Sequence, residues 1–412
     1  MSDCDRHQPS LKPVDEALAL LLSQAESVTE RESVPLNQAL GRVLADPVKS
    51  QVDVPPWDNS AMDGYAVRSE DLTDDKTHLT IDQRIAAGSV GKPLTPGTAA
   101  RIFTGAPVPP GADVVVIQEV CEADGDRLLI KEKPAAGANI RSAGEDILQG
   151  EVILKPGLRL APQHLGLAAS VGVAELSVYR KLKVALFSSG DELVMPGNPL
   201  GAGQIYNSNQ FTLTGLLQQL GCETLEMGIV EDTFEATCDA LRQGAEEADL
   251  VLASGGVSVG EEDHVKPAVE SLGSLDLWKI ASRPGKPLAF GHINGTPFLG
   301  SPGNPVSLFV TFTIFGRPFI KKMQGLTTGI QPISRKVVAG FEKAATDKRQ
   351  EYARGRLEID EQGREVVRLF SNRSSGVLTS VAWANGLAVL PPMTAIKPGD
   401  VVDFIPYSEL IS

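Results

Sequence analysis

Apolar residues recur at two different spacings along the chain, and the spacing changes several times. Near the N-terminus they recur every three or four positions behind Ser10 and Pro13, which predicts an amphipathic helix ending near Gln24. From Val52 to Gly144 the apolar runs are short and are split by proline and glycine, as is typical of a small β-domain. Its expected strands cover residues 79–81, 100–103, 114–117 and 128–130.

From Lys183 to about Phe319, apolar runs alternate with helix-like stretches. This alternation predicts an α/β domain with a mostly parallel sheet and helices on both faces, which binds ligands at the carboxyl ends of its strands. From about Gln331 the chain returns to short strands and turns, which indicates a compact β-barrel or sandwich. The expected elements are strands at 184–187, 224–229 and 250–252, helices at 211–220 and 234–248, and later strands at 355–359, 366–370, 387–391 and 401–405.

The length and charge of the chain limit its domain organisation and the kinds of partner it can bind. A chain of 412 residues exceeds what one hydrophobic core usually supports, so we expect several domains. A formal net charge of -14 opposes nonspecific attraction to nucleic acid and to anionic lipid, and an aromatic content of 5% argues against base stacking. We therefore expect no nucleic acid and no membrane as partner, and any anionic ligand must be bound locally.

The cysteines and the N-terminus indicate in which cellular compartment the protein is expected. The four cysteines show no C-x-x-C spacing, which suits a reducing cytosol better than a disulfide scaffold. The first residues are polar rather than a signal peptide, and no apolar run approaches the roughly 20 residues of a membrane span. We expect a soluble cytoplasmic protein. The scattered histidines also argue against a histidine metal site and against a Ser-His-Asp triad.

Two glycine-rich turns, at 253–260 and 299–306, follow what read as neighbouring strands, and each leads into a helix-like segment. Such turns present backbone N–H groups to an anion. Between them, Lys279, Arg283 and Lys286 stand at the end of a third apolar run. The spacing matches neither the P-loop nor G-x-G-x-x-G, and one glycine turn alone is as often plain turn chemistry. The second turn and the cations favour a site for a phosphate-like ligand.

Carboxylates lie near these turns. Asp263 follows the first turn, and Asp232 ends an earlier strand. Such oxygens can bind magnesium or accept hydrogen bonds from a heterocycle, although Asp and Glu also cap helices. We favour magnesium ligation for these two residues. The segment 55–67 stays open between a structural loop, with Asp58 as a helix cap, and a functional role.

Several motifs occur in order along the chain: Asp58-Asn-Ser-Ala-Met-Asp-Gly-Tyr-Ala66, Thr104-Gly-Ala-Pro107, Asn139-Ile-Arg with Gly144-Glu-Asp146, Ser189-Gly-Asp-Glu-Leu193, Ser254-Gly-Gly-Val-Ser-Val-Gly260, Arg283-Pro-Gly-Lys-Pro287 and Pro302-Gly-Asn-Pro-Val-Ser307. Together they resemble the molybdopterin molybdenumtransferase family, the enzymes of molybdenum cofactor synthesis that include the E domain of gephyrin. The match runs from about residue 10 to the C-terminus.

This resemblance implies a homodimer of elongated subunits. It implies an elongated discontinuous domain at 1–50 and 146–180, an inserted β-domain at 51–145, an α/β molybdopterin-binding domain at 181–328 and a C-terminal β-barrel domain at 329–412. The implied reaction inserts molybdate into the dithiolene of adenylylated molybdopterin and releases AMP, with Mg²⁺ assisting. The adenylyltransferase that supplies the substrate is a further expected partner.

The resemblance also implies roles for individual residues. Arg283 and Lys286 would hold molybdate with Arg354 and Ser375, while Lys279 would stabilise charge on the phosphoanhydride. Asp232 and Asp263 would hold magnesium at the pyrophosphate. Asp63, Thr104 and Asp146 would complete the catalytic cleft across the dimer interface. The implied substrate-binding residues on the sheet are Glu192, Ser254, Gly255, Gly256, Ser258, Gly260, Pro302, Gly303, Asn304 and Pro305.

Two other functions compete with this one. A nucleotide-pyrophosphate hydrolase on the same α/β layer, resembling the competence-damage protein family, would explain the glycine turns but gives the inserted β-domain no role. A dimeric scaffold that binds a partner's peptide, as gephyrin does, would need aromatic-lined grooves. The chain holds 3 Trp and 5 Tyr, which argues against such grooves.

Overall fold

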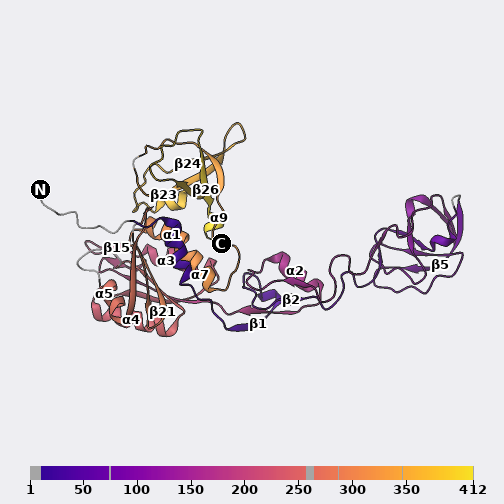
Figure 1. Cartoon of the computed structure of the whole chain (residues 1–412), viewed down its shortest axis with the longest axis horizontal. Helices are drawn as coiled ribbons and strands as arrows, with labels where there is room; N and C mark the ends of the chain where they lie inside the picture. The colour runs from indigo at the N-terminus through magenta and orange to yellow at the C-terminus, as the bar shows by residue number, and fades with distance from the viewer. Residues whose placement is uncertain (1–10, 74–75, 257–263, 286, 346, 412) are drawn as a thin grey trace.

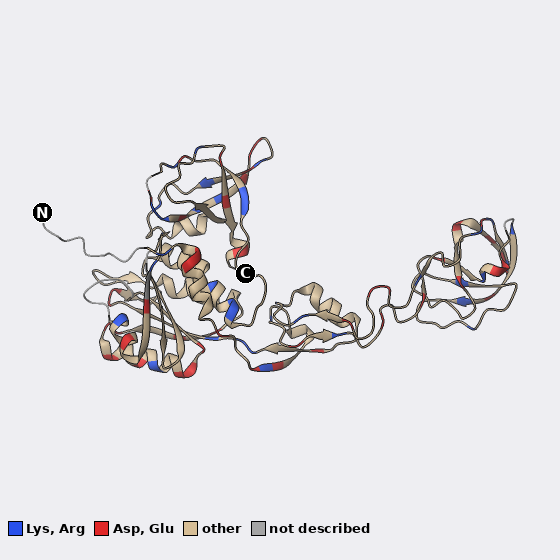
Figure 2. Ribbon diagram, in the orientation of Figure 1, with Lys and Arg blue, Asp and Glu red and all other residues tan. Residues whose placement is uncertain are grey.

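The computed structural model describes residues 11–73, 76–256, 264–285, 287–345 and 347–411. The molecule is elongated (Figure 1). The α/β domain and the C-terminal barrel lie together at one end, a narrow arm extends from them, and the small β-domain that contains β5 lies at the far end. In Figure 2, Lys and Arg are dispersed among Asp and Glu over every part of the ribbon. Among the described residues, no helix is long and apolar enough to cross a membrane.

The α/β domain is built on a six-stranded sheet with the order β16-β13-β17-β21-β20-β18. Its central pairs, β13 with β16, β13 with β17 and β17 with β21, are parallel, whereas β20 runs antiparallel to both of its neighbours. The mostly parallel sheet expected from the sequence is thus confirmed. The strands are β13 (Lys183–Ser189), β16 (Glu223–Val230), β17 (Leu250–Ser254), β18 (Gly273–Lys279), β20 (Pro287–Ile293) and β21 (Thr296–Ser301).

Helices cover both faces of this sheet, and strand β13 shows why. Val184 and Leu186 pack into one core, while Ala185 and Phe187 pack into the other. Because successive side chains of a strand point to opposite faces, a strand covered on both faces reads as a continuous apolar run. The first core includes α1 (Val14–Ser23), α3 (Ser208–Gln219), α6 (Pro305–Thr311) and α7 (Arg317–Met323), the last two joined by a π-helical segment (Phe312–Gly316). The second includes α4 (Phe234–Glu247) and α5 (Val265–Leu272).

The arm is formed by two stretches of chain that are far apart in sequence. β1 (Arg31–Pro35) pairs with β12 (Glu175–Tyr179), and β2 (Val48–Lys49) pairs with β11 (Val152–Leu154). The helix α2 (Pro162–Ser170) packs on them, and the sequence patterns did not predict it. The β-domain is therefore inserted into a discontinuous elongated unit.

The inserted domain holds a six-stranded sheet with the order β7-β4-β6-β5-β9-β8. The sequence predicted parts of β5, β6, β7 and β9 but neither β4, which lies between β6 and β7, nor the edge strand β8. At Gly64 of β4, a Cβ would lie 2.0 Å from the carbonyl oxygen of Val116, so the strands pack too closely for any other residue. Asp58 does not cap a helix; its Oδ1 accepts a hydrogen bond from Ala143 N at 2.8 Å. The strands are β4 (Gly64–Val67), β5 (Thr77–Ile85), β6 (Thr98–Ile102), β7 (Val114–Ile117), β8 (Cys121–Asp124) and β9 (Arg127–Ile130), and beside them β3 (Asn59–Ser60) pairs with β10 (Ile140–Arg141).

The C-terminal strands form a closed barrel rather than a sandwich. The order β23-β24-β22-β26-β25 is closed by pairing of β25 with β23, which leaves no free edge among these five strands. A short strand of the α/β domain, β19 (Ser282–Arg283), adds to β23 in parallel. The elements are β22 (Arg335–Ala339), β23 (Gln350–Ile359), β24 (Glu365–Leu369), β25 (Gly386–Leu390), β26 (Val401–Pro406), α8 (Thr379–Trp383) and α9 (Tyr407–Leu410).

Candidate active site

The candidate site lies at the carboxyl edge of the parallel strands. β13, β17 and β21 end in Ser189, Ser254 and Ser301, all of which are buried. In the strand register, Ser254 stands opposite both Ser188 of β13 and Ser301 of β21. The two glycine turns therefore leave neighbouring strands at the same edge, as the sequence predicted.

The first turn is fixed by its backbone. Gly255 N donates a hydrogen bond to Ser301 O at 3.1 Å. Its φ of +89° lies in the left-handed region, and a Cβ here would lie 2.6 Å from Ser189 O. Both constraints require glycine. Gly256 also has a positive φ, of +65°. Three predicted site residues of this segment, Ser258, Gly260 and Asp263, lie outside the described residues.

The second turn, residues 302–305, is held from two sides. Asn209 Nδ2, in the first turn of α3, donates to Gly303 O at 2.8 Å, while Asn209 Oδ1 is buried without a hydrogen-bond partner among the described residues. Val306 N donates to Ser375 O at 3.0 Å, which joins the turn to the barrel. A Cβ on Gly303 would lie 4.0 Å from Gly255 Cα, so the two turns are neighbours. The predicted residues Pro302, Gly303, Asn304 and Pro305 make up this turn.

Two predicted carboxylates lie beside the turns. Asp232 follows β16, and its Oδ1 accepts a hydrogen bond from Ser189 Oγ at 3.2 Å. Glu192 is exposed in the turn after β13. Among the residues that the structure describes, no three His, Cys, Asp or Glu side chains gather as a ready-made metal site.

The cationic segment crosses from the sheet to the barrel. At the end of β18, exposed Lys279 accepts a backbone hydrogen bond from Lys12 N at 2.9 Å. Ser282 then pairs with Gln350 of the barrel, and its Oγ donates to Gly285 O at 2.7 Å. Lys286 follows and lies outside the described residues. The segment is thus anchored to both domains just before the predicted molybdate-binding lysine.

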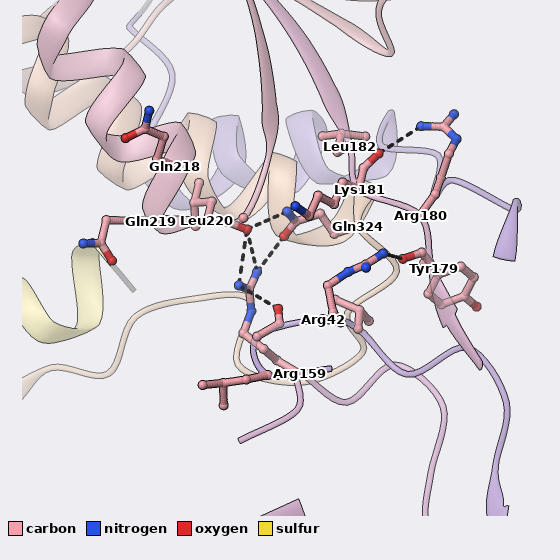
Figure 3. Close-up of a pocket in the computed structure, with 14 residues that line it drawn as sticks. Arg42, Arg159, Tyr179, Arg180, Lys181, Leu182, Gln218, Gln219, Leu220 and Gln324 are labelled. Atoms are coloured by element: carbon pink, nitrogen blue, oxygen red, sulfur yellow. Dashed lines mark hydrogen bonds between the residues drawn. The ribbon is translucent and has the colours of Figure 1, made fainter. Parts of the chain in front are cut away.

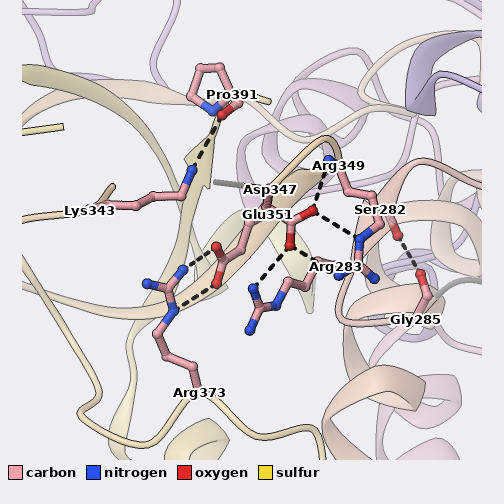
Figure 4. Close-up of polar contacts among 9 residues, drawn as sticks. All are labelled: Ser282, Arg283, Gly285, Lys343, Asp347, Arg349, Glu351, Arg373 and Pro391. Carbon is pink, nitrogen blue, oxygen red and sulfur yellow. Dashed lines mark hydrogen bonds and ion pairs between the residues drawn. The ribbon is translucent and has the colours of Figure 1, made fainter. Parts of the chain in front are cut away.

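Ion pairs surround this segment on the barrel side (Figure 4). Arg283 Nη1 donates to Asp347 Oδ2 at 3.0 Å, and Arg349 binds the same carboxylate with Nε and Nη2, both at 3.0 Å. The hydrogen bonds from Arg349 and then from Arg283 hold the pKa of Asp347 well below its usual range. The side chain of Arg283 remains 39% exposed. Nearby, Arg373 pairs with Glu351, which is 1% exposed. Three guanidinium groups against two carboxylates leave this interface positive.

Arg354 and Ser375 have different surroundings. Arg354 is 2% exposed, and it donates from Nε to Ser380 Oγ at 3.0 Å and from Nη2 to Asn372 O and Ser374 O. It thus supports the loop that brings Ser375 to the second turn. Ser375 lies at the sheet edge, and Arg354 lies behind it in the barrel.

The predicted catalytic residues of the inserted domain lie elsewhere. Asp63 Oδ1 accepts hydrogen bonds from Thr104 N at 2.8 Å and Thr104 Oγ1 at 2.7 Å, and these bonds lower the pKa of Asp63. Asp146 is exposed where the inserted domain meets the arm, and its N donates to Val54 O. The inserted domain lies at the opposite end of the molecule from the sheet (Figure 1). Asp63 and Thr104 therefore do not meet Arg283 within one chain.

Models of known protein families match the arm with the inserted domain, the α/β domain and the barrel. Residues 12–172 match the MoeA N-terminal region (domain I and II), residues 185–322 match a probable molybdopterin binding domain, and residues 336–407 match the MoeA C-terminal region (domain IV). The solved structures include two of the molybdopterin biosynthesis MoeA protein from Pyrococcus horikoshii. They superpose with TM-scores of 0.84 and 0.80 at 29% and 31% identity; each comparison covers 97% of this chain, and 100% and 99% of those chains.

Curated relatives agree with these matches. The molybdopterin molybdenumtransferase of Haemophilus influenzae is 38% identical over 400 residues, which cover 97% of this chain and 99% of that protein. The protein of the same name from Nostoc sp. is 39% identical over 392 residues, which cover 93% and 90%. The family and the fold class that the motifs predicted are confirmed. Similarity over nearly the whole length shows that this chain belongs to the molybdopterin molybdenumtransferase family of enzymes.

Proposed function

We propose that this enzyme inserts molybdate into adenylylated molybdopterin and releases AMP, the step that completes the molybdenum cofactor. The observation that carries the proposal is the meeting of two features at one edge: two glycine turns with neighbouring backbones, and the Arg283 segment bridged to the barrel. A tetrahedral dianion and a phosphoanhydride both need N–H donors and cations. Family membership favours this reaction over a hydrolase or a scaffold.

The glycine turns suit the nucleotide–pterin substrate. Gly255 and Gly303 carry no side chain, so phosphate oxygens can approach the backbone closely. The described side-chain groups at this edge that can ligate a metal ion are oxygens: the Asp232 carboxylate lies beside Ser189 Oγ. Mg²⁺ prefers one or two carboxylates together with substrate phosphates, and this donor set fits that preference. Asp232 would hold the ion with Asp263, and the ion would neutralise charge on the anhydride.

The Arg283 segment suits molybdate. A guanidinium presents parallel N–H donors that match a tetrahedral oxyanion, and Arg283 is exposed enough to reach one. Asp347 fixes the position of Arg283 before the dianion arrives. Lys286 and Ser375 would complete the pocket, Arg354 would support it through the 372–374 loop, and Lys279 would stabilise charge on the anhydride. The adenylyl group is already activated, so the protein has to position reactants rather than supply a nucleophile.

We further propose that the site is completed by a second copy of the chain. Asp63 and Thr104 form a hydrogen-bonded pair that one chain holds far from its own sheet edge (Figure 1). A homodimer would bring this pair, with Asp146, to the partner's turns. Mixing the impaired variants Asp63→Ala and Arg283→Gln should then restore activity, because one mixed site keeps both residues. Mixtures that stay as inactive as the separate variants would argue for sites within single chains.

The proposed partners and compartment follow from the substrates. Adenylylated molybdopterin would come from an adenylyltransferase, and transfer between the two enzymes would protect the labile dithiolene. Cys121, Cys222 and Cys238 are free thiols, which agrees with the cytoplasm as the place of reaction.

The test is AMP release by the purified protein with Mg²⁺ and adenylylated molybdopterin, with and without molybdate. We expect release to depend on molybdate. Release at the same rate without molybdate would replace the proposal with a pyrophosphate hydrolase.

A further inference from the structure

A cavity lies at the joint between the arm and the α/β domain (Figure 3), next to the residues that precede β13 and β16 and so at the opposite end of these strands from the candidate active site. Its volume is about 280 Å³, room for roughly nine water molecules at their liquid volume. The arm contributes Arg42 and Arg159, the connecting segment contributes Arg180 and Lys181, and the α/β domain contributes the end of α3 and Gln324. Four of the described lining residues are cationic, and none of them is a carboxylate.

Two of these cations are already paired. Arg42 binds Glu32 and also donates to Tyr179 O. Arg180 binds Asp249 with Nη1 and Nη2, each at 2.7 Å. None of the acidic partners lines the cavity. The charges of these two arginines are therefore largely neutralised from outside it.

Arg159 has no such partner among the described residues. The hydrogen bonds that it makes to them go to neutral acceptors: Gly41 O, Leu220 O and Gln324 Oε1. Its Nε is buried and donates to none of the described residues. A buried guanidinium normally has a carboxylate partner, because removing its charge from water is costly.

The surroundings do not neutralise Arg159. Cys222 is the ionisable group next to it, but burial raises the pKa of that thiol to about 12, so it stays uncharged at neutral pH. Burial lowers the pKa of nearby Lys321, and the charges of Arg317 and Arg159 lower it further, while the Glu409 carboxylate acts in the opposite direction. Lys181, at the rim, is exposed and forms no ion pair with any described carboxylate.

We propose that this cavity binds a phosphate-type tetrahedral oxyanion, either free phosphate or the phosphate of a small monoester, between Arg159 and Lys181. The bound anion accepts a hydrogen bond from Lys181 Nζ and offsets the charge of the half-buried Arg159 guanidinium beside it. Because the two residues come from the arm and from the connecting segment, the anion also ties the arm to the α/β domain. The site is independent of the reaction at the sheet edge.

The test is lysine footprinting of the wild-type protein. The rate of reductive methylation is followed at each lysine by mass spectrometry, in inorganic phosphate and in chloride of equal ionic strength. We expect phosphate to slow modification of Lys181 at least threefold. Lys155, an exposed lysine outside the cavity, is the internal control and should not change. Equal rates at Lys181 in both salts would overturn the proposal.

Variants separate the anion site from a purely structural joint. Arg159→Gln should abolish the protection of Lys181, while the amide can still donate to Leu220 O and preserve the fold; protection that survives would overturn the role of Arg159. Arg283→Gln, in the proposed active site, should leave the protection intact. In a further experiment, AMP replaces inorganic phosphate. Protection of Lys181 by phosphate alone indicates that the site binds free phosphate, and equal protection by AMP indicates that it binds a monoester.

Discussion

The two halves of the candidate active site are built differently. The sheet edge consists of backbone: glycine turns held by Gly255 N on Ser301 O and by Asn209 on Gly303 O. The barrel interface consists of side chains, with Arg283 and Arg349 sharing Asp347. The first half rests mainly on contacts within the α/β domain, with the Val306 N–Ser375 O bond as its link to the barrel, whereas every ion pair of the second half lies at or beyond the contact with the barrel.

This difference predicts which kind of substitution will damage each half of the site. The sheet edge has no space for a side chain at Gly255, so added atoms there should damage it whatever their polarity. The interface is partly exposed and depends on charge, so it should tolerate a change of shape and respond to loss of charge. Four substitutions, in order of decreasing expected effect, can break or sharpen this comparison.

Gly255→Ala should have the largest effect. The new Cβ would lie 2.6 Å from Ser189 O, and the backbone at position 255 has a φ of +89°, which alanine rarely adopts. The turn must therefore move. We expect AMP release to fall about 1000-fold, on the scale of a lost preorganised donor, with destabilisation of about 1–3 kcal/mol. Gly203→Ala is the matched control, with a φ of +81° and no atom within 4 Å. AMP release and melting temperature are measured for both variants. A similar loss of activity in both would assign the effect to backbone strain alone.

Arg283→Gln should lower molybdate-dependent AMP release about 100-fold, because a partly desolvated charge-assisted contact contributes about 3 kcal/mol. Arg283→Lys keeps the charge and should recover most of the rate with a higher KM for molybdate. Steady-state kinetics at varied molybdate concentration distinguish the two. Equal losses in both variants would mean that shape, not charge, governs the interface.

Asp347→Asn should have a moderate effect that depends on pH. The folded-state pKa of Asp347 is depressed, so its stabilising contribution is complete above the ordinary value of about 4 and is lost as pH falls toward the folded value. Wild type should therefore lose its stability advantage over the variant progressively as the pH falls below about 4, toward the folded-state pKa. Chemical denaturation at several pH values measures this. An advantage that is constant over this range would show that the carboxylate is not held by the two arginines.

Lys321→Met should have the smallest effect, and it tests a cation outside both halves of the site. Burial and the nearby arginines lower the pKa of Lys321 to about 7. The unfolded chain binds this proton more tightly, so wild-type stability should rise with pH between about 7 and 10. The variant should lack that rise, whereas Lys322→Met, with the same change of charge at the adjacent position, should keep it. Parallel pH profiles of the wild type and Lys321→Met would contradict the assignment.

The sequence predicted the layers well because their patterns are local. β13 and β17 appear as apolar runs, and α4 as a helical period behind Thr233, whose Oγ1 accepts a hydrogen bond from Ala236 N. The strand β4 was missed because it is only four residues long and directly follows a segment rich in turn-forming residues. Its glycine is required by the neighbouring strand, and a neighbour across a sheet leaves no local signal.

The site was predictable only in part. The turns and Arg283 could be found because glycine, proline and cations cluster within a few positions. The barrel residues Asp347 and Arg349 were missed because their partner lies about sixty positions earlier, so their pairing depends on how the domains dock. Arg159 was missed for the same reason: its acceptors come from the arm, α3 and the residue after α7.

The most direct test of the account is the position of molybdate itself, from the anomalous signal of molybdenum in crystals of the protein soaked in molybdate. The account predicts a peak within hydrogen-bonding distance of Arg283, between the glycine turns and the barrel, that disappears in Arg283→Gln. A saturated crystal with molybdate elsewhere and none at this interface would contradict it.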